Sequence, residues 1–152
     1  MSRLALALSV VAAVLAGCGG SSHDATPTTA LLTDVQVGGT SITFSFKSPP
    51  LHVRAAYQPK SRIVESGSGA PVPLKGAAYV VVHFEPAATA DLQGDQVKPT
   101  YTGPRRLAGP GPVLETAKTS DFEADLAWAI GLDHRLPLHV TRDGARVTVS
   151  FG

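Results

Sequence analysis

Alternation of apolar and polar residues between glycine and proline breaks constrains the fold of this chain most strongly. Residues 41–46 read Ser-Ile-Thr-Phe-Ser-Phe, and residues 147–151 read Val-Thr-Val-Ser-Phe. A period of two places successive side chains on opposite faces of an extended strand. Gly38-Gly39, Pro49-Pro50 and Asp143-Gly144 stand beside such runs and favour turns or strand ends. The pattern predicts short strands joined by turns.

Three further segments complete this interpretation. Residues 77–84 are nearly all apolar, which predicts a central strand covered on both faces. Residues 113–118 are a further candidate strand, and residues 138–151 predict a closing hairpin around Asp143-Gly144. The predicted fold class is therefore mostly β: a single antiparallel β-sandwich or barrel-like domain with little helix.

The segment 121–132 fits either a helix or a strand. Ser120 and Glu123 have the spacing of a capping box, and Phe122, Leu126 and Ile130 recur at helical spacing. Every second residue from 122 to 132 is also apolar, however, and a helix would leave Trp128 off its apolar stripe. We therefore predict one continuous strand.

Residues 87–112 are expected to form a long loop, and a long loop in a small domain is often functional. It contains Tyr101, Arg105 and Arg106. Aromatic rings and arginines are enriched where a protein surface recognises carboxylates or protein partners. These three residues are the candidate ligand-binding site, and the alternative is a mobile loop with two solvated arginines.

The first residues have the form of a bacterial lipoprotein signal. An apolar run from Leu4 to Leu15 follows Arg3; it is shorter than the roughly 20 residues of a spanning helix and matches a signal-peptide core. Leu15-Ala16-Gly17-Cys18 resembles the lipobox, in which the Cys thiol receives a diacylglyceryl group and becomes the new N-terminus. We expect a signal peptide over 1–17, lipidated Cys18 with a flexible tether over 18–31, and a β domain over 32–152.

Cysteine and charge counts limit the alternatives. The chain has a single Cys, so no internal disulfide is expected. Beyond Arg3 the chain carries twelve basic and twelve acidic residues, a balance that argues against nucleic-acid binding. The lipid on Cys18 is therefore the expected membrane contact, on the extracytoplasmic face of the cell membrane.

No catalytic or metal-binding motif stands out, and no cofactor is expected. Gly67-Ser68-Gly69 lacks the outer glycines of a hydrolase elbow. His83 and Glu85 share a strand face but lack a third ligand, and His134 and His139 have no zinc-motif spacing. On a continuous strand, three acidic residues would form a row on a solvated outer face, with a calcium site as the second interpretation; they are Asp121, Glu123 and Asp125.

The order of several short segments resembles the AMIN-like domain of actinobacterial lipoproteins and secreted proteins. The segments are Val53-Arg54 with Tyr57, residues 69–78, Tyr-Thr-Gly-Pro-Arg-Arg at 101–106, Asp-Phe-Glu at 121–123, Trp-Ala-Ile-Gly-Leu-Asp at 128–133, and the closing strand. The resemblance extends from about Thr33 to Phe151. It implies similarity to the AMIN domain, a non-catalytic β-sandwich that targets envelope proteins to peptidoglycan or to septal and secretion machinery. Gly38-Gly39-Thr40-Ser41 replaces a longer connection with an Asp-Arg pair, so no role of that pair is carried over.

These observations predict a non-catalytic binding module on a lipid tether, which recognises cell-wall peptidoglycan or an envelope protein. A carrier of an apolar small molecule or lipid, held in a hollow sandwich, is the alternative. A hydrolase is a third hypothesis, and it requires a facing Ser and His or a pair of carboxylates in a cleft.

Overall fold

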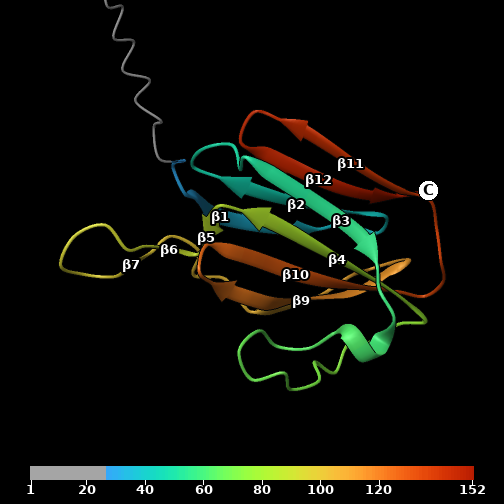
Figure 1. The fold of residues 1–152 in the computed structure, drawn as a ribbon. Helices are drawn as coiled ribbons and strands as arrows, with labels where there is room; N and C mark the ends of the chain where they lie inside the picture. Colours follow the sequence, from blue (N-terminus) through green and yellow to red (C-terminus); the bar gives the residue numbers. More distant parts are fainter. Residues whose placement is uncertain (1–26) are drawn as a thin grey trace, which may run out of the picture.

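Two five-stranded β-sheets pack against each other in the computed structural model, which describes residues 27–152 (Figure 1). In spatial order, the first sheet contains β11 (Leu138–Asp143), β12 (Arg146–Phe151), β2 (Ser41–Phe46), β1 (Ala30–Val37) and β5 (Ala87–Ala88). The second contains β3 (His52–Tyr57), β4 (Ala78–Glu85), β10 (Asp125–Leu132), β9 (Val113–Phe122) and β8 (Arg106–Ala108). A short 3-10 helix, η1 (Lys60–Arg62), and a small sheet of β6 (Ala90–Asp91) and β7 (Lys98–Pro99) complete the described elements. The predicted mostly-β sandwich is confirmed.

Apolar side chains from the inner faces of the two sheets fill the space between them. The Phe44 ring lies 4.9 Å from Phe84 and 5.9 Å from Trp128, measured between ring centroids. All three side chains are fully buried. Burial of each large apolar side chain stabilises the fold by about 1.5–3 kcal/mol, so a core of this kind holds the domain together without disulfides.

Most of the predicted strands are present. The alternation over 41–46 forms β2, the apolar run forms β4 between β3 and β10, and the closing hairpin pairs Asp143 with Arg146 at its turn. All but one of the pairings between neighbouring strands of the two large sheets are antiparallel; the exception is the short pairing of β1 with β5. Val140 remains 38% exposed because β11 is an edge strand.

The prediction of one continuous strand over 121–132 is wrong. The chain reverses direction at Glu123 and Ala124, so β9 ends at Phe122 and β10 begins at Asp125 as its antiparallel partner. Both turn residues have positive φ, 50° and 61°. Neither residue is the Gly or Asn that such turns usually contain, so the sequence gives no turn signal there.

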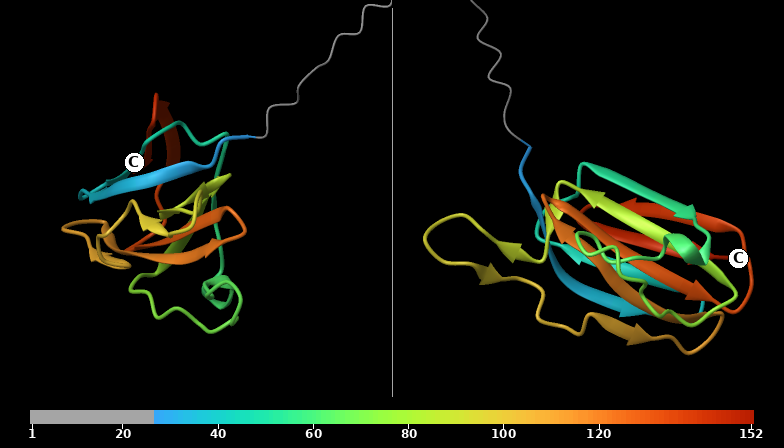
Figure 2. Two further views of the ribbon diagram at one scale, coloured as in Figure 1. Left: turned by 90° about the vertical axis from the view of Figure 1, so that its left-hand side faces the viewer. Right: turned by 60° about the horizontal axis from the view of Figure 1, so that its bottom comes forward.

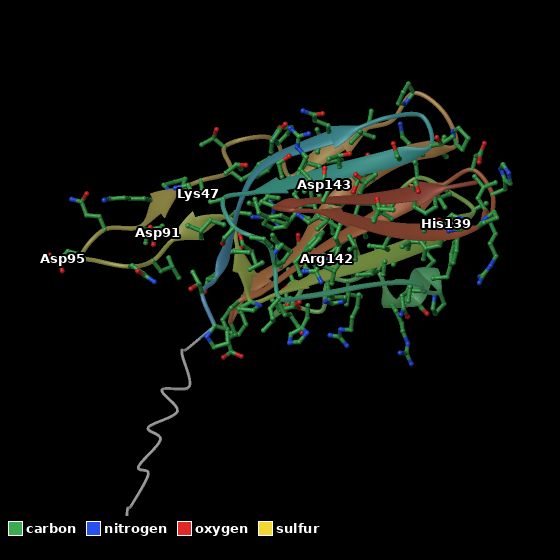
Figure 3. The ribbon with its side chains drawn as sticks, turned by 90° about the horizontal axis from the view of Figure 1, so that it is seen from above. Lys47, Asp91, Asp95, His139, Arg142 and Asp143 are labelled. Carbon is green, nitrogen blue, oxygen red and sulfur yellow. The ribbon has the colours of Figure 1, made fainter. Side chains whose placement is uncertain are left out.

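The segment 87–112, which we expected to form a long loop, contains the four short strands β5 to β8. Ala87–Ala88 pairs in parallel with the start of β1, and Arg106–Ala108 adds an edge strand to β9. Between them, β6 and β7 form a hairpin that projects from one end of the sandwich (Figures 1 and 2). Asp91 and Asp95 lie on this projection, away from Arg142 and Asp143 on β11 (Figure 3).

The described chain enters the domain at the end that carries the projecting hairpin, and the C-terminus lies at the opposite end (Figure 1). Ala30 and Leu31, which we assigned to the tether, belong to β1, because Ala30 is fully buried and its amide donates to the Pro86 carbonyl at 2.9 Å. Cys18, the signal peptide and most of the tether lie outside the described residues. Over residues 27–152, no helix has the length and apolar character to cross a membrane.

Candidate functional site

The segment between β3 and β4, residues 58–77, folds over the outer face of the second sheet; we call it the cover segment. Its apolar side chains form a second small core with outward-facing residues of the sheet. The members of this core are Ile63, Val72 and Leu74 from the cover segment and Tyr79, Ala117 and Ala129 from the sheet. The Ser66 amide also donates to the Thr119 carbonyl at 2.9 Å. The cover segment is therefore a third layer of the domain (Figure 2).

An open groove of about 270 Å³ lies between the cover segment and the sheet. Its polar lining consists of Gln58, Arg62, Ser66, His83, Thr119, Ser120 and Asp125. Thr119 and Ser120 both line the groove because β9 bulges there: Ala127 pairs with Ser120, whereas Trp128 pairs with Lys118. The volume is just below the usual range for ligand pockets, about 300–1,000 Å³, so the groove fits a small polar group or one unit of a longer ligand.

His83 and Asp125 form a side-chain pair in the groove. His83 Nδ1 lies 2.9 Å from Asp125 Oδ1, and both side chains are about one-third exposed. The inner faces of β4 and β10 carry the core residues Phe84 and Leu126, so the residues on either side point outward. Sequence reasoning identified both residues singly but did not bring them together, because it treated residues 121–132 as one strand.

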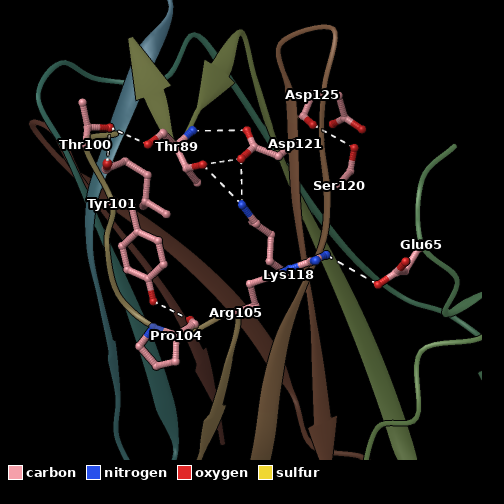
Figure 4. Close-up of polar contacts among 11 residues, drawn as sticks. Glu65, Thr89, Thr100, Tyr101, Pro104, Arg105, Lys118, Ser120, Asp121 and Asp125 are labelled. Atoms are coloured by element: carbon pink, nitrogen blue, oxygen red, sulfur yellow. Dashed lines mark hydrogen bonds and ion pairs between the residues drawn. The ribbon is translucent and has the colours of Figure 1, made fainter. Parts of the chain in front are cut away.

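Tyr101 supports the fold at the point where the 87–112 segment crosses the core. Its ring packs edge-on against Trp128, with centroids 5.8 Å apart, and its hydroxyl donates to the Pro104 carbonyl at 2.8 Å (Figure 4). Burial, with a smaller contribution from the negative charge of Asp34, raises the pKa of Tyr101 above its ordinary value. The hydroxyl therefore remains a neutral donor at physiological pH.

Arg105 and Arg106 both contact the cover segment but from different positions. Arg105 Nη2 lies 3.5 Å from Glu65 Oε1, and the arginine side chain is 67% exposed. Arg106 Nη1 lies 2.9 Å from Glu115 and donates to the Pro73 carbonyl at 2.5 Å. The three candidate residues from the sequence therefore do not converge on one pocket. Arg105 contacts Glu65, the chain neighbour of the groove residue Ser66, whereas Arg106 contacts the cover segment at Pro73.

Glu115 is a nearly buried carboxylate that Arg106 and the cover segment satisfy. Burial opposes its ionisation, but the hydrogen bond from the Lys75 amide at 3.0 Å and the contact with Arg106 outweigh burial. The pKa of Glu115 is therefore lowered. The Lys75 amide bond to Glu115 and the Arg106 bond to the Pro73 carbonyl therefore attach the cover segment to β9 and β8.

The predicted row of acidic residues on one strand face is wrong, because the hairpin separates its members. Asp121 lies on β9, where Thr89 and Lys118 surround it (Figure 4). Lys118 Nζ donates to Asp121 Oδ2 at 2.7 Å. Burial opposes ionisation of Asp121, but hydrogen bonds from Lys118 and Thr89 outweigh it and lower its pKa. Asp121 therefore ties β9 to the 87–112 segment, whereas Asp125 lines the groove.

The remaining sequence candidates lie apart from one another. Ser68 is in an exposed turn, where its hydroxyl accepts a hydrogen bond from the Ala70 amide at 3.2 Å. His134 pairs with its neighbour Asp133 at 2.6 Å, and His139 is exposed on β11 (Figure 3). Within residues 27–152, one set of three possible metal ligands gathers. It adds Asp125 to His83 and Glu85, so the expectation that this pair has no third ligand is wrong.

Two packed sheets with a covered outer face define a β-sandwich domain that carries an open polar groove. The chain belongs to the AMIN-like family: the family model, AMIN-like domain, matches residues 30–151. The match runs from the first residue of β1 to the last residue of β12, which confirms the resemblance seen in the sequence. Searches among curated proteins and solved structures found no match.

Proposed function

We propose that this protein is a non-catalytic binding module of the bacterial cell envelope, displayed on a lipid anchor at Cys18, and that it recognises cell-wall peptidoglycan. The polar groove beneath the cover segment is the observation that carries the proposal. Membership of the AMIN-like family supports it, because the family consists of envelope-associated binding modules. An envelope protein is the alternative partner.

The chemistry of the groove suits a ligand with carboxylate, amide and hydroxyl groups. Arg62 offers a forked cationic donor, which matches a carboxylate. Gln58 offers both a donor and an acceptor, and the Ser66 hydroxyl offers the same pair of roles. Peptidoglycan presents sugar hydroxyls beside peptide carboxylates and amides, so it offers partners for each of these groups.

The end of the domain where the chain enters supports a position close to a membrane. Among residues 27–152, five large hydrophobic side chains are exposed, and four of them lie beside Pro27, on the projecting hairpin or at the end of β9: Leu51, Leu92, Val97 and Phe122. Leu51 borders a surface hollow with Pro27 and Thr28, and Leu92 borders another with Thr28. A lipid on Cys18, nine residues before Pro27, would hold this apolar end near the bilayer.

The core packing does not support the carrier alternative. A carrier needs an interior cavity between the sheets, but Phe44, Phe84 and Trp128 meet there at 4.9–5.9 Å between centroids. Mass spectrometry of an organic extract of the native protein tests the alternative directly, because a carrier co-purifies with its lipid.

Co-sedimentation with purified peptidoglycan tests the wall-binding proposal. The protein is residues 18–152 with Cys18→Ser, which retains every described strand. The wild-type groove is expected to bind, and Arg62→Ala is expected to weaken binding by about ten-fold, the loss of roughly 1.4 kcal/mol from one charged hydrogen bond. The same binding measurement on Arg105→Ala tests whether Arg105, a candidate ligand-binding residue from the sequence, contributes to binding.

Arg146→Ala is the matched control, because it removes one exposed arginine from β12 on the other sheet. It should bind like the unchanged protein. Absence of binding by the unchanged protein rejects peptidoglycan as the ligand, and equal weakening by Arg146→Ala rejects the groove as the site.

Metabolic labelling with a fatty acid tests the anchor separately. The label should attach to the full chain in its native host and be absent from Cys18→Ser. Persistence of the label in that variant would place the lipid elsewhere. This result does not depend on what the groove binds.

A further inference from the structure

We propose that His83, Glu85 and Asp125 form a binding site for a divalent transition-metal ion of the Zn²⁺ type. The three residues lie on the outer face of the second sheet, on the adjacent strands β4 and β10, and His83 and Asp125 also line the groove. Their ligating atoms all lie within 4.8 Å of one another. The site shares His83 and Asp125 with the groove, but the proposal does not depend on what the groove recognises.

Strand register brings the three ligands together. His83 lies opposite Ala127, and Phe84 lies opposite Leu126, so continuation of the register puts Glu85 opposite Asp125. Neighbouring strands are about 4.8 Å apart and every second residue shares a face. On this face of the sheet, the imidazole and the two carboxylates therefore occupy three of four neighbouring positions. Ala127 occupies the fourth.

The two carboxylates themselves point to a cation. Like charges directly opposite each other on neighbouring antiparallel strands destabilise a sheet. Asp125 approaches His83 at 2.9 Å, and Glu85 approaches Arg54 at 3.2 Å. Arg54 is 70% exposed, however, and an exposed ion pair contributes only about 0–1 kcal/mol. A metal ion between the carboxylates would compensate both charges and would release Arg54 at little cost.

The donor set favours zinc over calcium or magnesium. Zn²⁺ accepts imidazole nitrogen and carboxylate oxygen at about 2.0–2.2 Å, which separates tetrahedral ligands by about 3.3 Å. Side-chain rotations that move each ligand atom by about 1 Å would bring the present spacings to that value. Calcium and magnesium prefer oxygen ligands alone, usually six or more. Three protein ligands would leave one tetrahedral position for water or a ligand group, and the groove that His83 and Asp125 line adjoins the site.

Calorimetric titration with ZnCl₂ tests the site on residues 18–152 with Cys18→Ser, because a free thiol is itself a zinc ligand. We expect one equivalent to bind and the midpoint of thermal unfolding to rise. His83→Ala and Asp125→Asn should each weaken binding by about ten-fold or more, and Glu85→Gln should also weaken it. Arg54→Gln should tighten it several-fold, because the competing partner of Glu85 is removed.

His134→Ala is the matched control, since His134 also pairs with an aspartate, Asp133, but without a third ligand. Its zinc affinity should stay within about two-fold of the unchanged protein. No saturable binding by the unchanged protein would overturn the proposal. So would equal affinity in His83→Ala, a loss in His134→Ala as large as in His83→Ala, or tighter binding of Ca²⁺ than of Zn²⁺. Thermal unfolding without metal confirms that each variant is folded.

Discussion

The ring of Tyr101 stands edge-on to the indole of Trp128, with an interplanar angle of 83° and centroids 5.8 Å apart. Trp128 is fully buried at the centre of the core, whereas Tyr101 belongs to the long 87–112 segment. This contact attaches the segment to the core. A residue that the sequence marks as a ligand contact therefore has a structural role as well.

Replacement of Tyr101 should affect stability before it affects binding. Tyr101→Ala is expected to lower the free energy of unfolding by about 2–4 kcal/mol, through lost burial and the lost edge-on contact. Tyr101→Phe retains the ring and loses only the bond to the Pro104 carbonyl, so it should cost about 0.5–1.5 kcal/mol. Urea denaturation of both variants measures the difference. Equal losses would contradict a role for the ring.

Gly131→Ala should displace the cover segment. A Cβ at position 131 would lie 1.8 Å from the Lys75 carbonyl oxygen, and this backbone atom cannot move away by a side-chain rotation. We expect a loss of about 2–4 kcal/mol and increased amide exchange over residues 58–77. Gly39→Ala is the control, because the nearest atom to its added Cβ is 4.0 Å away. Slow exchange retained in Gly131→Ala would show that the cover segment tolerates the clash.

The turn between β9 and β10 should accept stabilising substitutions. Glu123 and Ala124 both have positive φ, a conformation that costs an ordinary residue about 1–2 kcal/mol. The double variant Glu123→Asn with Ala124→Gly introduces the pair that two-residue hairpin turns prefer. Its unfolding free energy should rise by about 1 kcal/mol, after the extra chain entropy of glycine is deducted. Ala124→Val should act in the opposite direction, and a stabilising effect of valine would refute the turn geometry.

Acidification should weaken the contact between β9 and the 87–112 segment. The pKa of Asp121 is lower in the folded protein than its ordinary value, so its contribution to stability is complete above the unfolded pKa and is lost as the pH falls through the folded one. Loss should begin below about pH 4. Asp121→Asn should reduce the slope of unfolding free energy against pH in this range. Asp95→Asn, on the projecting hairpin, changes the charge equally away from the network and should leave the slope unaltered.

Local sequence patterns predicted the strands in which the order of apolar and polar residues follows burial. The alternation in β2 identified a strand because its burial follows a period of two, and the apolar run identified β4 because apolar neighbours lie on both of its faces. The turn at Glu123-Ala124 escaped detection because tertiary pairing imposes a conformation that neither residue prefers. The groove escaped for a related reason. His83 and Asp125 become neighbours only through the register of β4 with β10, and that register depends on the turn.

The candidate binding residues were also predicted only in part from the sequence. Arg105 and Arg106 were selected by residue type, and both contact the cover segment rather than one shared ligand pocket. Arg62 and Gln58 were not selected, because they follow β3 in a segment without a recognisable pattern. The apolar residues at 63, 72 and 74 were the available signal, since buried side chains in a loop indicate a segment that packs onto another surface.

The position of β1 determines how the domain would respond to mechanical force. The described chain enters directly into β1, which lies between β2 and β5. Hydrogen bonds between strands run roughly across the strand direction, so tension applied along β1 at residue 27 loads the bonds to both neighbours together, in shear. They include the Ala30 amide to the Pro86 carbonyl and the Lys47 amide to the Leu31 carbonyl, each 2.9 Å. Tension at the N-terminal end of the domain would therefore have to break these hydrogen bonds together rather than one after another.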